Sequence, residues 1–200
     1  MNWQKQVWVF DDVVSKKHQE KIKDIVLGTS FLWSFSPDIT TNAQNKLPGF
    51  SHTFVRKGEI HPLNDKEVLQ MLENLLESSL IKMYEKTETK GNYNVSEARS
   101  FLQLPVTYVK GGTYGSHHID IAREHFVLLY YVCDSDGDTV LFENMYDHQN
   151  PKIPEPLELT EKIRVTPKQG RLVIFDGYHW HTATAPAKNI RCVINMTVVS

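Results

Sequence analysis

Two stretches in the first half of the chain place apolar residues at helical spacing. In residues 15–28 the isoleucines and a valine share one face opposite lysine and glutamate, and a glycine ends the segment. In residues 65–86 a longer stripe of leucines follows Asn64 and Glu67, which have the form of a capping box. The pattern predicts two amphipathic helices that pack against a core.

From residue 98 onward the pattern changes to short runs of β-branched and aromatic residues separated by Gly, Asp and Pro, which are typical of strands. These runs are residues 101–110, 125–133, 139–142, 162–165, 172–175 and 191–199. The near-alternation of Trp8, Phe10 and Val13 predicts one further strand at the start of the chain. Residues 29–62 and 87–97 are polar and rich in breakers, which predicts loops apart from a strand at 52–56.

Helices first and strands afterwards predict an α+β plan, with helices buttressing a two-sheet sandwich or jelly roll. The length of 200 residues predicts one domain. Within it, we expect a helix-rich part, residues 1–97, to pack on a strand-rich core, residues 98–200.

Composition narrows the class of protein. Apolar residues make up 40% and charged residues 23%, as in globular proteins, and a net charge of -2 gives no electrostatic argument for a nucleic-acid or membrane partner. The first ten residues have too short an apolar run for a signal peptide or a membrane span. Cys133 and Cys192 lie far apart and in no CxxC pair, which predicts buried thiols in a reducing cytoplasm.

The first candidate metal-binding residues along the chain are in the tripeptide His118-Ile119-Asp120. If this segment is a strand, residues i and i+2 point to the same face, so the imidazole and the carboxylate can reach one point. They would be two of the three ligands of a 2-His-1-carboxylate site for Fe(II). His117 should face the other way.

A second segment, residues 170–181, is an apolar strand that ends in a turn and two histidines, His179 and His181. Both would lie on the same face of a continuing strand, so the residues alone leave the third ligand open between them. Arg191 follows ten residues after His181. A guanidinium there could bind a carboxylate in a buried site, or it could pair with a surface acid.

The order HxD, distal His and then Arg ten residues later resembles the Fe(II)/2-oxoglutarate-dependent dioxygenases, and most closely their prolyl-4-hydroxylase-like branch. The resemblance covers about residues 100–199. It includes Tyr108, ten residues before the first histidine ligand, and the strand-turn-strand pattern of residues 129–132 and 137–142.

The resemblance implies a double-stranded β-helix that hydroxylates an unactivated C–H bond and releases succinate and CO2. The implied cofactors are Fe(II), 2-oxoglutarate and O2, with ascorbate as a candidate addition. The implied site residues are His118, Asp120 and His181 for the metal, Arg191 for the far carboxylate of 2-oxoglutarate, and Tyr108 and Asn195 beside that cosubstrate.

The substrate is less well defined by the sequence. Tyr114, Arg123 and His179 are candidate substrate residues, and the substrate class is a prolyl or other amino-acid side chain of a peptide, or a free small molecule. One glycine of the family's usual pair is replaced at Asp138, which bears on substrate access more than on iron. Pro186 stands one position late, which weakens the case for a prolyl substrate.

Two alternatives are a nucleic-acid demethylase of the same superfamily and a non-catalytic jelly-roll binding module. The first usually has a second arginine near the end of the last strand, and residues 195–200 contain none. The second would be expected to lack a metal ligand or the arginine, and all are present.

Overall fold

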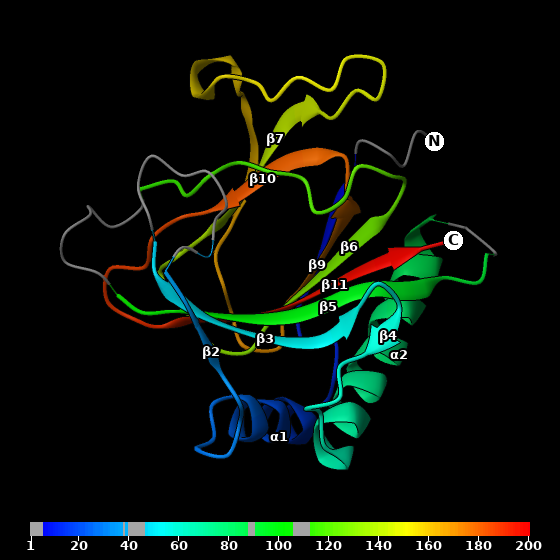
Figure 1. The fold of residues 1–200 in the computed structure, drawn as a ribbon, viewed down its shortest axis with the longest axis vertical. Helices are drawn as coiled ribbons and strands as arrows, with labels where there is room; N and C mark the ends of the chain where they lie inside the picture. Colours follow the sequence, from blue (N-terminus) through cyan, green and yellow to red (C-terminus); the bar gives the residue numbers. More distant parts are fainter. Residues whose placement is uncertain (1–5, 38, 40–46, 88–90, 106–112) are drawn as a thin grey trace.

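The chain folds mainly into antiparallel β-structure with two α-helices (Figure 1). The computed structural model describes residues 6–37, 39, 47–87, 91–105 and 113–200. Its elements are β1 (Val7–Phe10), α1 (Lys16–Val26), β2 (Ser34–Ser36), β3 (Gly49–Arg56), β4 (Glu59–Ile60), α2 (Lys66–Thr87), β5 (Asn94–Gln103), β6 (Phe126–Tyr131), β7 (Thr139–Met145), a 3-10 turn (Pro156–Glu158), β8 (Glu161–Val165), β9 (Leu172–Asp176), β10 (His179–Ala183) and β11 (Arg191–Val199).

The strands form a large and a small sheet. The large sheet has the order β1-β9-β6-β11-β5-β3-β2, with β4 paired to β3, and the small sheet has the order β10-β7-β8. Successive side chains of β6 point to opposite faces. Val127, Leu129 and Tyr131 pack with Leu141 of β7 and Val165 of β8, so one hydrophobic cluster joins the two sheets. This face-to-face arrangement is the jelly roll that the strand pattern predicts.

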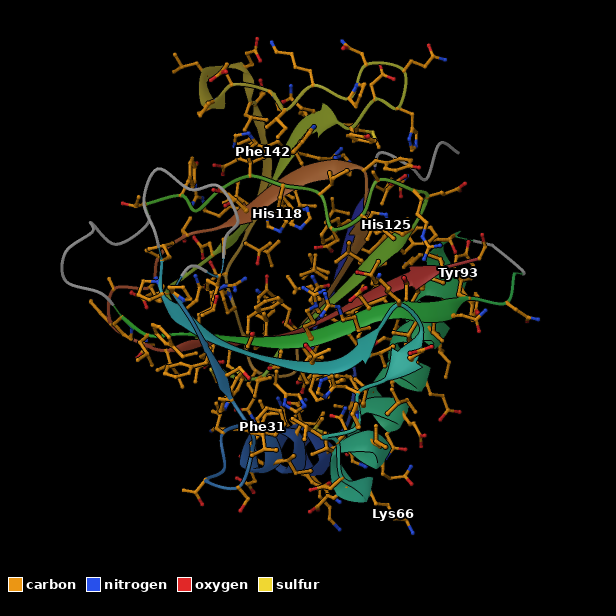
Figure 2. All side chains as sticks on the ribbon, in the orientation of Figure 1. Phe31, Lys66, Tyr93, His118, His125 and Phe142 are labelled. Carbon is orange, nitrogen blue, oxygen red and sulfur yellow. The ribbon has the colours of Figure 1, made fainter. Side chains whose placement is uncertain are left out.

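The opposite face of the large sheet packs against the two helices. A second cluster joins Ile22 of α1 and Leu75 of α2 to Leu128 of β6 and Ile194 of β11. Figure 1 shows both helices on the side of the large sheet away from the small sheet, and in Figure 2 the labelled Phe31 lies on the helix side and Phe142 on the side of the small sheet. The helices therefore occur close to the predicted segments, on the face that does not line the space between the sheets.

The ends of the helices differ in detail from the prediction. Ser15 caps α1 by accepting a hydrogen bond from the backbone N–H of His18, and the helix ends at Val26, before the predicted glycine. Asp65 caps α2 by accepting from the N–H of Val68 at 2.9 Å, so the predicted capping box at Asn64 is wrong. The Asn64 amide instead donates to the carbonyl oxygens of residues 53, 54 and 61 and fixes the preceding loop.

The predicted loops contain strands that the sequence pattern missed. β2, β4 and the first three residues of β3 (49–51) lie in predicted loop within residues 29–62, and β5 begins at Asn94, inside the predicted loop at 87–97. Ser96, Ala98 and Ser100 are the buried positions at the start of β5. Because these side chains are small or polar, they give no hydrophobic alternation, although the strand is central to the large sheet.

Two further expectations concern the whole chain. Neither helix in the described part of the chain is long and apolar enough to cross a membrane. Cys133 and Cys192 are both buried free thiols, and burial raises the pKa of each. The buried thiols agree with the prediction from their spacing.

We expect Leu75→Ala to destabilise the protein by about 2–5 kcal/mol, the usual cost of a cavity in a packed core. Leu75 is fully buried between α2 and the large sheet. Ile81→Ala is a matched control on the same helix, since Ile81 is 51% exposed and should change stability little. Chemical denaturation of both variants measures the difference; equal loss in the two would contradict the packing described here.

Candidate metal centre

His118 and Asp120 lie in an extended segment between β5 and β6 rather than in a strand, which corrects the prediction. Two isolated β-bridges join this segment to the other chain segment: His118 pairs with His181 of β10, and Tyr114 pairs with Thr184, the residue after β10. The N–H of His118 donates to the carbonyl of His181 at 2.9 Å, and the N–H of His181 donates back at 3.0 Å. This reciprocal pair fixes the two histidines opposite each other.

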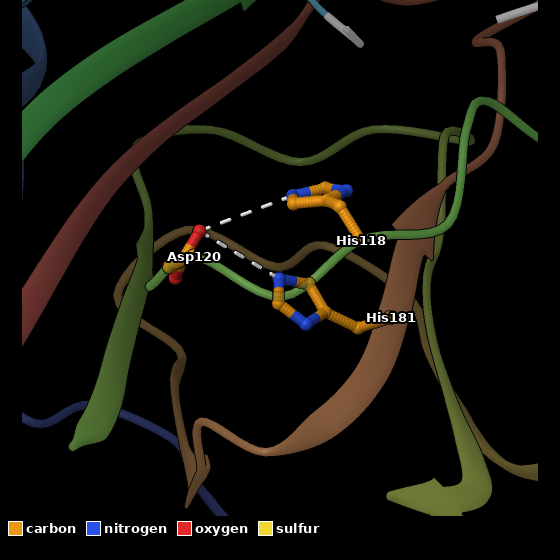
Figure 3. Close-up of side chains that lie close together, drawn as sticks. All are labelled: His118, Asp120 and His181. Atoms are coloured by element: carbon orange, nitrogen blue, oxygen red, sulfur yellow. Dashed lines mark ion pairs between the residues drawn. The ribbon is translucent and has the colours of Figure 1, made fainter. Parts of the chain in front are cut away.

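The three predicted metal ligands converge on one point (Figure 3). The Nε2 atoms of His118 and His181 each lie 3.9 Å from Oδ1 of Asp120, and one ligand atom from each residue lies within 4.8 Å of the others. The two imidazole rings are 4.5 Å apart between centroids. His181, not His179, belongs to this cluster, so the geometry favours the choice that the spacing to Arg191 suggested.

Hydrogen bonds to the backbone select the tautomer of each histidine. Nδ1 of His118 lies 3.1 Å from the carbonyl oxygen of Ser116, and Nδ1 of His181 lies 3.0 Å from the carbonyl oxygen of His179. A carbonyl oxygen can only accept, so Nδ1 carries the proton in both rings. Nε2 is then left with a free lone pair, which faces Asp120 and is ready for a metal.

The surroundings of Asp120 and His181 favour the protonation states that a metal requires. Burial lowers the pKa of His181 to about 4, with His118 contributing, so its ring is neutral at pH 7. Burial disfavours charge on Asp120, but the nearby His181 and His118 and the Asn195 amide outweigh it and hold the pKa of this carboxyl below its usual value. Nδ2 of Asn195 lies 3.2 Å and 3.4 Å from the two carboxylate oxygens. A neutral imidazole and an ionised carboxylate are the forms that bind metal.

The triad lies in the wall of a cavity of about 90 Å³ between the two sheets. A cavity of this size has room for several water molecules or a small organic acid. Its lining residues include the three triad residues and Asn195, apolar side chains from β6, β9 and β11, and the polar group Arg191, Gln103 and Thr139. The cavity therefore has a candidate metal-binding part and a polar part that contains a cation.

Arg191 is 5% exposed, and its hydrogen-bond acceptors among the described residues are all neutral. They are the carbonyl oxygen of Gly137 at 3.0 Å, Oε1 of Gln103 at 3.2 Å and Oγ1 of Thr139 at 2.8 Å. No carboxylate among the described residues forms an ion pair with it, and burial lowers its pKa. A buried guanidinium without an acidic partner is costly unless an anion neutralises it, so this cavity is suited to an anionic ligand.

Gly137 allows the approach of Arg191 to the cavity. A Cβ atom at this position would lie 2.9 Å from the carbonyl oxygen of Thr184 and 3.0 Å from Cδ of Arg191. A side chain here would displace the guanidinium stem or the backbone of the segment after β10. In the predicted turn Gly137-Asp138, residue 137 must therefore lack a side chain for Arg191 to reach the cavity.

The remaining predicted site residues lie elsewhere. Tyr108 falls outside the described residues. Tyr114 hydrogen-bonds Glu161 and Arg164 at the surface of the small sheet, and the Arg123 guanidinium donates to Ser96. His179 is buried, with Nδ1 2.9 Å from the carbonyl oxygen of Phe142. The three candidate substrate residues are absent from the lining of the cavity that holds the triad.

Gln103 and Thr139 are residues of the site that sequence reasoning missed. Gln103 pairs directly with Arg191 in the register of β5 and β11, and Thr139 approaches from β7 of the opposite sheet. Tyr131 donates to Oγ1 of Thr139 at 2.7 Å, so this oxygen already accepts from both Tyr131 and Arg191. The hydroxyl proton of Thr139 is then directed to another acceptor, such as a bound anion.

A buried acid near the site predicts a pH effect on stability. Burial raises the pKa of Asp176, at the end of β9, to about 6. A raised acid pKa means that the folded state holds the proton more tightly, so stability falls as pH rises from about 4 to 6, by roughly 3 kcal/mol. Asp176→Asn should therefore stabilise the protein by about 1–3 kcal/mol at pH 7 and much less at pH 4. Denaturant titrations at both pH values measure this; equal gains at both would contradict it.

Comparison with solved structures places this architecture among known folds. An oxidoreductase of the 2OG-Fe(II) oxygenase family from Burkholderia pseudomallei superposes with a TM-score of 0.67 at 12% identity, over 96% of this chain and 84% of that one. The α-ketoglutarate-dependent epimerase SnoN from nogalamycin biosynthesis gives 0.68 at 9% identity, over 98% and 79%. A collagen prolyl hydroxylase of Paramecium bursaria Chlorella virus-1 gives 0.57 at 13% identity, over 96% and 94%. This chain has the fold of the 2OG-Fe(II) oxygenases.

No protein-family model matches the sequence, and no curated protein matches it. Identities of 9–13% establish a common fold and leave the chemistry to the residues of this chain.

Proposed function

We propose that this protein is an Fe(II)/2-oxoglutarate-dependent dioxygenase that hydroxylates an unactivated C–H bond. The observation that carries the proposal is one cavity lined both by the His118, Asp120 and His181 triad and by Arg191, a buried cation with no acidic partner among the described residues. A triad of this composition is the usual ligand set for non-haem Fe(II), and it leaves coordination positions open for further ligands.

The chain's residues fit that metal and cosubstrate. Nε2 of His118, Nε2 of His181 and the Asp120 carboxylate would hold Fe(II), and Asn195 keeps the carboxylate oriented by donating to both oxygens. Arg191 would bind the far carboxylate of 2-oxoglutarate, with Thr139 donating to the same group. When bound, the iron and its cosubstrate supply the oxidising chemistry, while the apolar walls of the cavity exclude water from it.

We also propose that residues 1–200 act as one domain, with α1 and α2 buttressing the large sheet that carries Arg191 and Asn195. The shared cluster of helix and strand side chains supports this arrangement. The substrate class that the resemblance suggests, a prolyl or other amino-acid side chain or a small molecule, draws support from structural relatives that include prolyl hydroxylases.

The proposal is tested by an anaerobic titration of metal-free protein, first with Fe(II) and then with 2-oxoglutarate. We expect a weak visible charge-transfer band only when both are present, because it requires the cosubstrate to chelate the bound iron. Succinate can replace 2-oxoglutarate as a matched control, since it lacks the keto oxygen and should give no band.

No band in folded, metal-loaded protein would refute binding of 2-oxoglutarate as described. The protein would then be better described as a non-catalytic binding module, and the buried cation Arg191 would indicate that its ligand is a different anion.

A further inference from the structure

A second cavity adjoins the first on the other side of Asp120 and Asn195. It measures about 210 Å³. Its lining residues are Glu97, Arg99, Phe101, Asp120, Ile121, Asn195 and Thr197. Phe101, Asp120 and Asn195 line both cavities, so a molecule in the second one would lie next to the carboxylate of the triad.

The register of β5 and β11 explains this arrangement. Along the face between the sheets, Arg191 pairs with Gln103, Val193 with Phe101, Asn195 with Arg99, and Thr197 with Glu97. The two strands run side by side through the large sheet (Figure 1). The first cavity borders the residue pairs near Arg191, and the second cavity borders the pairs near Glu97. Between them lies the pair of Asn195 and Arg99, in which Asn195 contacts Asp120.

Arg99 is the charged group of this wall that is open to a ligand. Glu97 is already engaged, because Oε2 pairs with Nη2 of Arg99 at 2.9 Å and Oε1 accepts from the N–H of Lys57 at 3.1 Å. Nε of Arg99 is buried and has no hydrogen-bond partner among the described residues. The Arg99 side chain is 41% exposed, so it can reach both the cavity and solvent.

We propose that the second cavity is the substrate site and that it binds a small carboxylic acid, whose carboxylate pairs with Arg99. Glu97 holds the guanidinium in place through Nη2, and the remaining η N–H groups donate to the ligand. Phe101 and Ile121 contact the apolar body, which places a C–H bond of the acid beside Asp120. The proposal rests on the function proposed above and names its substrate class.

The charges also separate the two anion sites. Arg191 is buried and faces the cavity between the sheets, whereas Arg99 lies at the half-exposed end of the same face. A dicarboxylate held by the metal and Arg191 therefore leaves Arg99 available for a second acid. The two arginines can be tested independently for this reason.

The test is ligand-observed saturation-transfer NMR on the full chain, loaded with redox-inert Zn(II) and saturating 2-oxoglutarate. The probes are linear and branched carboxylic acids of four to ten carbons, each compared with its own primary amide. We expect acids to bind at least about tenfold more tightly than their amides, because only the acid forms the charged pair with Arg99. Arg99→Gln should remove this preference, while Arg164→Gln, on the outer small sheet, should retain it.

Arg191→Gln separates this proposal from the proposed function. Arg191→Gln should lose 2-oxoglutarate binding and still bind the acid probes. Arg99→Gln should keep 2-oxoglutarate binding and lose the preference for the acid probes over their amides. The substrate proposal is overturned if no acid in the set binds, if amides bind as tightly as acids, or if Arg99→Gln keeps the preference. Loss of 2-oxoglutarate binding in the parent protein would instead count against the proposed function, and the acid-amide comparison would still be decisive for Arg99.

Discussion

His181→Ala is expected to lower the affinity for Fe(II) by more than about 100-fold, since a lost ligand should cost more than the 10–100-fold of a lost outer hydrogen-bond partner. His181 is 6% exposed, supplies one of three ligand atoms, and has Nδ1 fixed by the carbonyl oxygen of His179. Among the described residues, no histidine besides His118 and His181 belongs to the cluster, so none is placed to replace His181. The charge-transfer band should disappear with the metal.

His117→Ala is the matched control for this experiment. His117 is the neighbour of His118, but its Nε2 lies 2.8 Å from the carbonyl oxygen of Pro154, away from the triad. We expect this variant to bind Fe(II) with the parent affinity, measured by anaerobic calorimetry. Parent-like iron binding by His181→Ala, or loss of iron in His117→Ala with the fold intact, would show that the ligand set is wrong.

The fold of the variant must be measured beside its metal affinity. The imidazole of His181 lies 5.1 Å from the Phe175 ring between centroids, so its removal leaves a small space in the inner wall. The backbone bridge between His118 and His181 does not depend on the side chain. We therefore expect the far-ultraviolet circular dichroism to stay unchanged, which would assign the loss of iron to the ligand itself.

The convergence of His118, Asp120 and His181 could be predicted because it depends on residues close in sequence and on a simple spacing. His118 and Asp120 are two residues apart, and His181 and Arg191 are ten apart. The three side chains converge although the segment around His118 is not a regular strand. The reciprocal bridge to β10 supplies the regularity that a full strand would have given.

Other parts of the site depend on contacts that no local pattern encodes. Gln103 meets Arg191 only through the register of β5 on β11, and Thr139 meets it only because the two sheets face each other. The start of β5 was missed because its buried side chains, Ser96 and Ala98 among them, are small or polar. A hydropathy pattern predicts strands that bury large apolar side chains, and the start of β5 buries only small or polar ones.

The same limit applies to the substrate residues. Tyr114 and Arg123 flank the HxD motif in sequence, yet their side chains bond to Glu161 and Ser96 outside the cavity with the triad. Arg99 lies far from the motif in sequence and lines a cavity that borders Asp120. Proximity along the chain is a poor guide to which residues line a cavity, since loops direct neighbouring side chains to different surfaces.

Arg191→Gln is expected to weaken 2-oxoglutarate binding by roughly 2–5 kcal/mol, the usual cost of removing one partner of a buried charged pair. Arg191 is the only described cation that lines the cavity with the triad. Gln keeps a hydrogen-bond donor but loses the charge and the two-pronged geometry that match a carboxylate. Iron binding should be retained, because Arg191 is not in the ligand cluster.

The sign of the stability change distinguishes a functional arginine from a structural one. Without an anion, Arg191 is a buried cation whose acceptors in the described part of the chain are three neutral groups, so its removal relieves a desolvation cost while losing those hydrogen bonds. We expect these effects to offset, leaving the free energy of unfolding within about 2 kcal/mol of the parent in the absence of 2-oxoglutarate. Saturating 2-oxoglutarate should then stabilise the parent and not the variant.

Thermal unfolding with and without 2-oxoglutarate, at constant Zn(II), measures both parts of this prediction. Arg171→Gln is the matched control, since Arg171 pairs with Asp11 on the surface and should leave the stabilisation by 2-oxoglutarate intact. A large loss of stability in ligand-free Arg191→Gln, with cosubstrate affinity unchanged, would make Arg191 a structural residue. If Arg191→Gln instead changes the stability of the ligand-free protein little but greatly weakens 2-oxoglutarate binding, the role of Arg191 is to bind the ligand.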